Sequence, residues 1–347
     1  MLSAPIGPDL ANAAEVMIKD YLAVSGKDTV LITADTSSDM AVVEAILNCA
    51  DMTGAKTVVM IIPPLPFQGT LADPYISEPL AAAMKQCDVW VDLTFPYLAG
   101  SNAWDKAMAG KRTRYCLCGD LKGDSMVRMF SKVDLDALFR VQKAFAEITT
   151  KAVGKTCRLT NSLGSDLTFT LDKSPYPKPR RAKTPGMYTV PGAHPLWPVY
   201  DSVKGVITVD TAFHEYYTAM PSPMVLEIDG RVRKVTGGGA EQKVMDRALK
   251  RAAGGKNYGY VIHFTCGLQP AARYTRSCFV EDQRVMANNA VGLGIPFWQP
   301  GGGENHPDAV MSQQSIWIDG KHIMDEGTFV GSNKLAKLAD ALQPLYN

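Results

Sequence analysis

The chain has 347 residues, an apolar fraction of 46% and a formal net charge of +1. This length suits one large or two modest domains with a sizeable core. The basic residues are scattered, which argues against binding to nucleic acid or to a charged membrane surface. The N-terminal 22 residues contain Pro5, Pro8, Asp9 and Glu15 where a signal peptide needs a basic start and an apolar middle, so we expect no export.

The seven cysteines show no secretory spacing. Free thiols in a reducing compartment are the simpler interpretation, and we therefore expect a cytoplasmic protein. Cys116 and Cys118 are one residue too close for a Cys-x-x-Cys pair, so we assign them to a buried strand.

Helical and strand patterns alternate through the first 150 residues. Helices are predicted over 9–24, 36–50, 76–84, 102–109 and 133–153, and apolar strands over 29–33, 57–62, 88–93 and 114–118. Strands that are apolar on both faces indicate a mostly parallel, doubly wound sheet covered by helices on both sides. We place a domain boundary near residue 150, between an α/β, Rossmann-like domain (1–150) and an α+β domain (151–347).

Ligands of such sheets gather outside the carboxyl ends of the strands. The sequence contains neither Gly-x-Gly-x-x-Gly nor the complete Walker motif Gly-x-x-x-x-Gly-Lys-Ser/Thr, which disfavours a dinucleotide-binding role. The loop over 94–101 is aromatic and rich in hydroxyl groups, and it contains Tyr97 and Ser101. It suits one wall of a pocket for a flat small molecule, although a plain connection is an equally good interpretation.

The second half shows strands joined by turns. A hairpin is predicted over 158–171, a strand over 206–209, and two hairpins with type I′ turns at Asp229-Gly230 and Asp319-Gly320. A helix is predicted over 240–252. The segment 174–201 holds seven prolines and several aromatic residues, so we expect a packed loop over a site.

A glycine-rich stretch, Gly301-Gly302-Gly303-Glu304-Asn305, precedes His306-Pro307-Asp308. An imidazole and a carboxylate separated by one residue lie on the same face of an extended segment, so both could hold one ion. A hydrogen-bonded surface pair is the more common interpretation of such a spacing. The prediction of a metal site therefore depends on a third ligand.

All five histidines fall after residue 193. His263 lies in the apolar strand 260–264 and is followed by the strand-breaking Gly267-Leu268-Gln269-Pro270. With His306 and Asp308 it would complete two histidines and one carboxylate, a set that occupies one face of an iron(II) ion and leaves positions open. A satisfied core histidine is the alternative.

These residues resemble a known family. His263, the Gly-Leu-Gln-Pro segment, the glycine-rich loop and His306-x-Asp308 are similar to the 2,5-dihydroxypyridine 5,6-dioxygenases, which are related in fold to the metal-dependent aminopeptidases of the aminopeptidase T type. The resemblance implies that His263, His306 and Asp308 are iron ligands.

The aminopeptidase branch differs in its acids. Those enzymes hold two metals, whose repulsion is reduced by bridging carboxylates. This chain has Pro191-Gly192-Ala193-His194 where they would carry Pro-Gly-Gly-Glu, and His263 where they carry a glutamate. The missing acids favour a single iron over a dinuclear hydrolytic centre.

The chain also departs from the dioxygenase pattern. That pattern implies an acid–base histidine after the strand 88–93, where this chain has Pro96-Tyr97-Leu98. We therefore expect Tyr97 or His194 to move the proton instead.

The leading hypothesis is a non-haem Fe(II)-dependent dioxygenase that opens a hydroxylated pyridine or a related heteroaromatic ring with O₂. Candidate substrate contacts are Gln269, Arg273, Tyr274, Ser101 and Glu304, the last also as a partner of the ligands. We expect a homo-oligomer. Two alternatives stay open: a metal-dependent peptidase or amidase using zinc or manganese, and a small-molecule binding protein without a metal.

Overall fold

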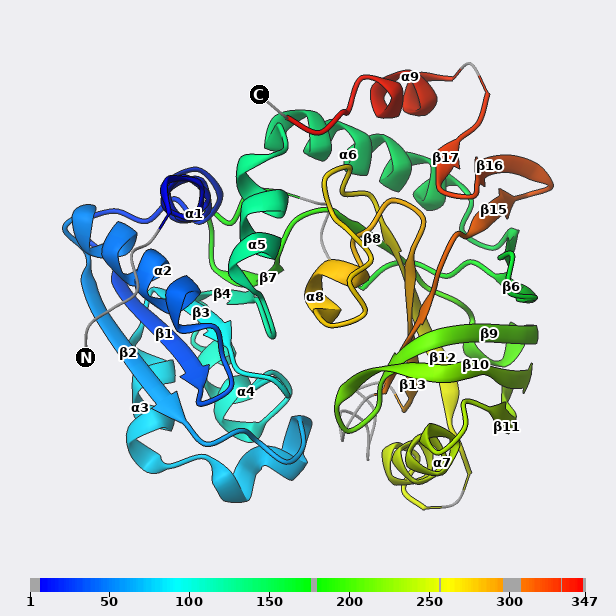
Figure 1. Cartoon of the computed structure of the whole chain (residues 1–347), viewed down its shortest axis with the longest axis horizontal. Coiled ribbons are helices and arrows are strands. Elements are labelled where there is room, and N and C mark those ends of the chain that lie inside the picture. Colours follow the sequence, from blue (N-terminus) through cyan, green and yellow to red (C-terminus); the bar gives the residue numbers. More distant parts are fainter. Residues whose placement is uncertain (1–6, 176–179, 256, 296–306, 332, 346–347) are drawn as a thin grey trace.

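In the computed structural model, two β-sheets lie side by side and helices surround them (Figure 1). The structure describes residues 7–175, 180–255, 257–295, 307–331 and 333–345. Its α-helices are α1 (Pro8–Glu15), α2 (Met40–Met52), α3 (Glu78–Gln86), α4 (Asn102–Ala109), α5 (Gly123–Met126), α6 (Leu135–Lys151), α7 (Glu241–Ala252), α8 (Phe279–Asp282) and α9 (Lys334–Asp340). Two π-helical turns cover Val16–Tyr21 and Val127–Ser131, and two 3-10 helices cover Gly69–Tyr75 and Tyr200–Ser202.

The strands follow the same chain order. They are β1 (Thr29–Asp35), β2 (Lys56–Ile62), β3 (Val89–Leu93), β4 (Arg114–Leu117), β5 (Thr156–Thr160), β6 (Asp166–Thr170), β7 (Gly186–Thr189), β8 (Ala193–Leu196), β9 (Lys204–Phe213), β10 (Tyr217–Asp229), β11 (Arg231–Gly237), β12 (Tyr260–Gly267), β13 (Asn289–Gly294), β14 (Asp308–Met311), β15 (Ser315–Ile318), β16 (Lys321–Asp325) and β17 (Thr328–Phe329).

The first sheet is parallel and has the order β2-β1-β3-β4-β7. Val30 and Ile32 of β1 join a core cluster with residues of α1 and α2, whereas Leu31 joins a second cluster with residues of α3 and α4. Helices therefore cover both faces, as the apolar strands predicted. β2 is an edge strand and leaves Val58 and Ile61 exposed, although its sequence is as apolar as that of β1.

The fifth strand of this sheet comes from the second half of the chain. β7 pairs with β4 in parallel, so the chain returns to the first sheet after the boundary predicted near residue 150, which falls at the end of α6. The described part of the proline-rich segment 174–201 contains β7 and β8. It is packed, as expected, but it is more regular than a loop.

The second sheet is antiparallel and has twelve strands. Its path runs β17-β16-β15-β5-β6-β9-β14-β13-β12-β8, and β10 and β11 extend from β9. The chain is thus a mixed α/β protein with one parallel and one antiparallel sheet. The predicted α/β part and the strand-rich second part are both present.

One of the two predicted type I′ turns is wrong. Asp319 and Gly320 both have positive φ, 51° and 73°, as such a turn requires. At the other hairpin only Gly230 has positive φ. The Gly230 N–H donates to Val203 O at 2.8 Å, so this tip is held by a neighbouring segment.

The one-turn helix α8 lies between the two sheets (Figure 1). Asp120, just after β4, accepts hydrogen bonds from the Phe279 and Val280 N–H groups at 2.6 and 3.0 Å. The fully buried Glu281 accepts two hydrogen bonds from Arg128, from Nε at 2.5 Å and from Nη2 at 2.7 Å. These contacts tie the parallel sheet to the segment that leads into β13.

The core contains all seven cysteines, which are free and buried. Cys116 and Cys118 lie in and directly after β4, with their sulfur atoms 3.7 Å apart, as the assignment to a buried strand predicted. In the described parts of the chain, no helix is both long enough and apolar enough to cross a membrane.

His194 in β8 connects the antiparallel sheet to α6. Its Nε2 is 3.0 Å from Thr149 Oγ1, and its ring packs against Phe145 at a centroid distance of 4.9 Å. The Thr149 hydroxyl donates to Ala146 O, so it accepts from His194 Nε2–H, and Nδ1 carries the lone pair. Burial lowers the pKa of His194 to about 4, which keeps the imidazole neutral at neutral pH.

This buried imidazole predicts a loss of stability in mild acid. The unfolded chain binds a proton to His194 below its ordinary pKa of 6.5, whereas the folded chain resists protonation down to about pH 4. The free energy of unfolding should therefore fall as pH drops through this window, by about 3 kcal/mol from this residue. Urea titrations at pH 7 and pH 4 measure it.

The variant His194→Gln should lose less stability over the same pH range than the native chain. His322→Gln is the matched control, because His322 is an exposed hairpin residue stacked on Trp317. Equal pH dependence in the native chain and His194→Gln would contradict the assignment.

Candidate active site

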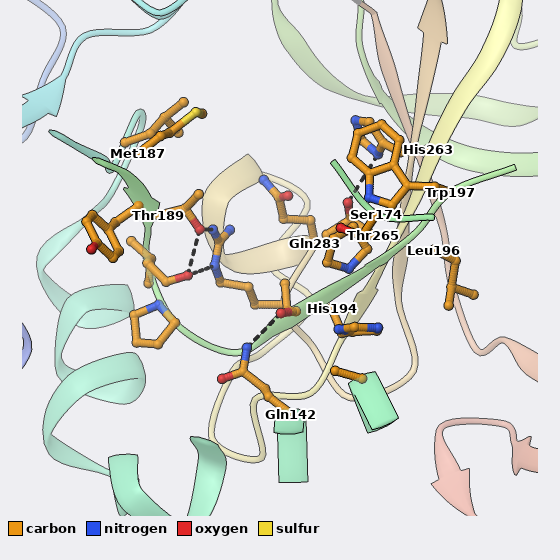
Figure 2. Close-up of a pocket in the computed structure, with 18 of the residues that line it drawn as sticks. Gln142, Ser174, Met187, Thr189, His194, Leu196, Trp197, His263, Thr265 and Gln283 are labelled. Carbon is orange, nitrogen blue, oxygen red and sulfur yellow. Dashed lines mark hydrogen bonds between the residues drawn. The ribbon is translucent and has the colours of Figure 1, made fainter. Parts of the chain in front are cut away.

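A cavity of about 630 Å³ lies where the carboxyl edge of the parallel sheet meets the antiparallel sheet. The loops and ends of β3, β4 and β7 supply one wall, including Tyr97, Leu117 and Thr189. The other walls come from α6 and from β8, β12 and β14. Figure 2 shows Met187 and Thr189 on one side of this space, with His263 and Trp197 across from them. The position agrees with the general rule for parallel sheets.

His263 and Asp308 are brought together across a glycine. His263 in β12 pairs with Gly292 in β13, and Gly292 pairs with Asp308 in β14. Residues directly opposite each other point to the same face of a sheet, and Gly292 puts no side chain between its two neighbours. The side chains converge over it, so that His263 Nε2 is 3.8 Å from Asp308 Oδ1. Both residues line the cavity.

Two neighbours orient the His263 ring. Its Nδ1 is 3.1 Å from Thr265 Oγ1, two residues along the same strand, and Trp197 packs edge-on at a centroid distance of 5.6 Å (Figure 2). When Nδ1–H donates to Thr265, Nε2 carries the lone pair and faces Asp308. This is the tautomer that an imidazole needs to bind a metal ion through Nε2.

His306 and Glu304, the other residues assigned to the metal site, lie outside the described residues. Within the described ranges, no group of three His, Cys, Asp or Glu side chains is arranged to hold a metal ion. The two predicted ligands that are described nevertheless fit a cation: a nitrogen and a carboxylate oxygen, 3.8 Å apart, both on one cavity wall. Such a mixed donor set suits a first-row transition metal.

Asp92 shapes the loop that carries Tyr97. This fully buried carboxylate accepts hydrogen bonds from Thr33 Oγ1 at 2.8 Å, Thr94 Oγ1 at 2.7 Å and Tyr115 OH at 2.8 Å. It also accepts from the backbone N–H groups of residues 94 and 98, both at 3.2 Å. The turn after β3 thus closes around one carboxylate, and Tyr97 enters the cavity from it.

Tyr97 keeps its proton at neutral pH. Burial raises the pKa of its phenol well above the ordinary value, and the negative charges of Asp120 and Asp308 raise it further. Its ring packs on Phe95 and Phe213 at 5.4 and 6.0 Å. Phe213 pairs with Asp308 in the sheet, so Tyr97 and the carboxylate are held on neighbouring elements.

His194 lines the same cavity, with a neutral imidazole. Among the described residues its Nδ1 has no hydrogen-bond partner. The structure therefore brings together His263, Asp308, Tyr97 and His194 out of the predicted set.

Gln269 and Arg273 have other surroundings. Gln269 is fully buried behind the cavity, where its Nε2 donates to Met129 O at 3.1 Å. Arg273 is exposed, and its backbone N–H donates to Glu281 Oε1. Neither residue is part of the cavity lining in the described structure.

Tyr274 and Ser101 also serve local contacts. The Tyr274 hydroxyl donates to Asp210 Oδ1 at 2.5 Å, and the Ser101 hydroxyl accepts from Trp104 N at the start of α4. Ser101 is thus a helix cap, the role that serine commonly has at this position. Their neighbours Gly100 and Trp104 reach the cavity instead.

Sequence reasoning missed several residues of the site. Thr265 and Gly292 set the geometry of His263 and Asp308, and the buried Arg284 lines the cavity. A glycine inside an apolar strand is a known sign of close approach, and Gly292 could have been found from it. Arg284 carries no such local signal.

Two solved structures share the fold of this chain. The solved structure of 2,5-dihydroxypyridine dioxygenase from Pseudomonas putida KT2440 is similar over 94% of this chain and 98% of its own, with a TM-score of 0.73 and 17% identity. Wild-type AmpT from Thermus thermophilus is similar over 93% of this chain and 99% of its own, with a TM-score of 0.61 and 13% identity. At these identities the likeness shows the fold. A search of curated protein sequences gives no match.

The family model described as 2,5-dihydroxypyridine 5,6-dioxygenase matches residues 19–331. This match spans most of the chain, including both sheets and the cavity between them. The resemblance inferred from the sequence is therefore confirmed, and the chain belongs to the 2,5-dihydroxypyridine 5,6-dioxygenase family.

Proposed function

We propose that this protein is an Fe(II)-dependent ring-cleaving dioxygenase that uses O₂ to open a hydroxylated pyridine or a related heteroaromatic ring. Family membership supports the reaction class. The observation that carries the proposal is the convergence of His263 and Asp308 over Gly292, on the wall of a cavity large enough for an aromatic substrate.

His263, His306 and Asp308 would hold the iron ion. His306 precedes Asp308 by two residues, a spacing that puts both on one face of an extended segment. Iron(II) held there would supply a Lewis acid for the substrate hydroxylate and electrons for O₂. Glu304 would then support the ligands.

The chain's own residues orient the ring and handle its proton. Tyr97 is a protonated phenol that lines the same cavity as Asp308, so it can donate a hydrogen bond to the substrate and give up a proton as the ring opens. His194 offers a neutral acceptor at Nδ1. We favour Tyr97 as the proton donor, because its phenol carries a proton at neutral pH, whereas the imidazole of His194 is neutral and presents a lone pair at Nδ1.

The other residues predicted to contact the substrate would support the shape of the site without touching the substrate, or would have no role in the reaction. Gln269 and Tyr274 would position the strands and loops around the site, since both are held by internal hydrogen bonds. Ser101 would do so by capping α4. Arg273 is exposed and does not line the described cavity, so it would contact the substrate only from outside the cavity.

A homo-oligomer in the cytoplasm is part of the proposal. The free state of all seven cysteines is what a reducing compartment favours. Edge strand β2 carries the exposed apolar residues Val58 and Ile61, and a second copy could pair with its open edge.

Replacing His306 tests the ligand set. His306→Ala should bind little iron when purified anaerobically and should consume no O₂ with 2,5-dihydroxypyridine, because two of three ligands rarely retain the ion. Metal analysis and an oxygen electrode measure both effects. His322→Ala, a histidine on an exposed hairpin, should keep the iron of the native chain.

Full iron and normal turnover in His306→Ala would sink the proposal. Hydrolysis of amide substrates that continues without O₂ would instead support a metal-dependent hydrolase. Absence of stoichiometric metal from the native chain would support a binding protein.

Substitutions at Gly292 test whether His263 and Asp308 share an ion, because they change neither of these proposed ligands. A side chain at this position would stand between His263 and Asp308, so Gly292→Ala should weaken iron binding and Gly292→Val should weaken it further. Iron titrations of the folded variants, with circular dichroism as the check on folding, measure the series. Iron affinity that is unchanged in Gly292→Val would show that the two side chains do not share an ion.

Tyr97→Phe separates proton transfer from packing. The phenylalanine keeps the aromatic contacts but has no hydroxyl, so kcat should fall by about 10²–10⁴-fold while iron content stays the same. His194→Gln should have the smaller effect on kcat. A larger fall for His194→Gln than for Tyr97→Phe would reverse the assignment.

A further inference from the structure

Arg284 is a buried cation in the cavity lining. Its side chain is 2% exposed and follows α8, the helix between the sheets. Its Nε donates to Val190 O at 2.6 Å, its Nη1 to Val280 O at 2.5 Å, and its Nη2 to Thr189 Oγ1 at 2.6 Å. A guanidinium has five N–H groups, so these three bonds leave one on each terminal nitrogen.

All three of these acceptors are uncharged. Among the residues that the structure describes, no Asp or Glu carboxylate lies within ion-pair distance of Arg284. The contrast is Arg128, whose charge is matched by Glu281 at 2.5 Å. Glu281 raises the pKa of Arg128, whereas burial lowers that of Arg284. A buried charge without a counter-charge destabilises the folded state. Buried charged side chains in proteins are therefore usually paired with an opposite charge, which can come from a bound ligand.

Among the described lining residues, no acid is placed to pair with Arg284. The acids that line the described cavity are Asp308, assigned above to the metal, and the exposed Asp172 at the rim. Lys173 and Arg180 are also exposed lining residues, so cations outnumber the acids that remain. An anionic ligand would be drawn in and would find its buried counter-charge at Arg284.

The size of the cavity agrees with a substituted ring. An apolar cavity of about 150 Å³ holds one benzene molecule. The volume here is about 630 Å³, which leaves room for a substituent beyond the ring that meets His263 and Asp308.

We propose that the substrate of this enzyme is a hydroxypyridine that carries a ring carboxylate, and that Arg284 binds this carboxylate through its two remaining N–H groups. The inference rests on the proposed function and narrows its substrate class. Arg284 is then a specificity-determining residue. The ring hydroxyl points to the metal ligands, and the carboxylate points to the junction of β7 and α8.

The test is a pair of ligands that differ only in charge. Binding of 6-hydroxypyridine-3-carboxylate and of the matching 3-carboxamide is measured by calorimetry, without O₂, on the iron-loaded native protein. In these compounds the substituent is not adjacent to the ring nitrogen or the hydroxyl, so it cannot chelate iron with either. The carboxylate should bind at least about tenfold more tightly, because a charge-assisted hydrogen-bonded pair is available to it alone. Equal affinities would overturn the proposal.

Substitutions test whether Arg284 causes the preference for the carboxylate over the carboxamide. Arg284→Met should abolish it, and Arg158→Met, which changes an exposed arginine paired with Asp166, should leave it unchanged. Arg284 also holds β7 against α8, so the double variant Lys173→Met/Arg180→Met provides a test that leaves this contact intact. The preference should survive in the double variant and in iron-free protein. Its disappearance from either, or its survival in Arg284→Met, would overturn the proposal.

These outcomes are distinct from failure of the proposed function. A chain that binds the carboxylate preferentially but consumes no O₂ with any hydroxypyridine would refute the dioxygenase and leave the Arg284 subsite standing. A chain that opens 2,5-dihydroxypyridine but shows no preference for the carboxylate would do the reverse.

Discussion

The buried charges around α8 hold the two sheets in the relation that creates the cavity. Asp120 at the end of β4 caps this one-turn helix, and Glu281 within it pairs with Arg128. Buried ion pairs add little net stability over apolar contacts of the same shape, but loss of one partner leaves an uncompensated charge that costs about 3–5 kcal/mol. The arrangement therefore fixes one relative placement of the sheets more than it strengthens the fold. The placement of Tyr97 and Asp308 on the walls of one cavity depends on this relation between the sheets.

The approach of His263 to Asp308 comes from ordinary sheet pairing. Residues two strands apart are about 10 Å apart at their backbones, which is too far for direct contact between short side chains. Over Gly292 a long imidazole and a carboxylate can lean toward each other, and the pairing irregularity between Val261 and His263 gives the strand a local twist at this point. Thr265 then sets which ring nitrogen faces the carboxylate.

The sequence predicted the local features of the fold well, because period and apolar content are local properties. The helices and strands up to residue 118, the hairpins and the buried cysteines agree with the structure. Pairings between distant segments were not predictable. The sequence of Gly186–Thr189 contains no local pattern that assigns it to the parallel sheet. The residues around Arg284 likewise give no local indication that it is buried. Chemical type and order along the chain singled out His263 and Asp308, which the structure places on one cavity wall. The role of Gly292 between these two residues is visible only once the pairing register of β12, β13 and β14 is known.

The number of acidic side chains that line the cavity limits how many metal ions it can hold. Two dications a few ångströms apart repel strongly unless carboxylates bridge them. Of the described lining residues, the acids are Asp308 and the exposed Asp172, while positions 194 and 263 carry imidazoles. A single iron(II) ion held by His263, His306 and Asp308, as proposed, would leave a net positive charge at the site, and the buried Arg284 would add to it. Such a site would favour an anionic substrate, so the small number of acids among the described lining residues supports both the proposed single iron and the proposed ring carboxylate.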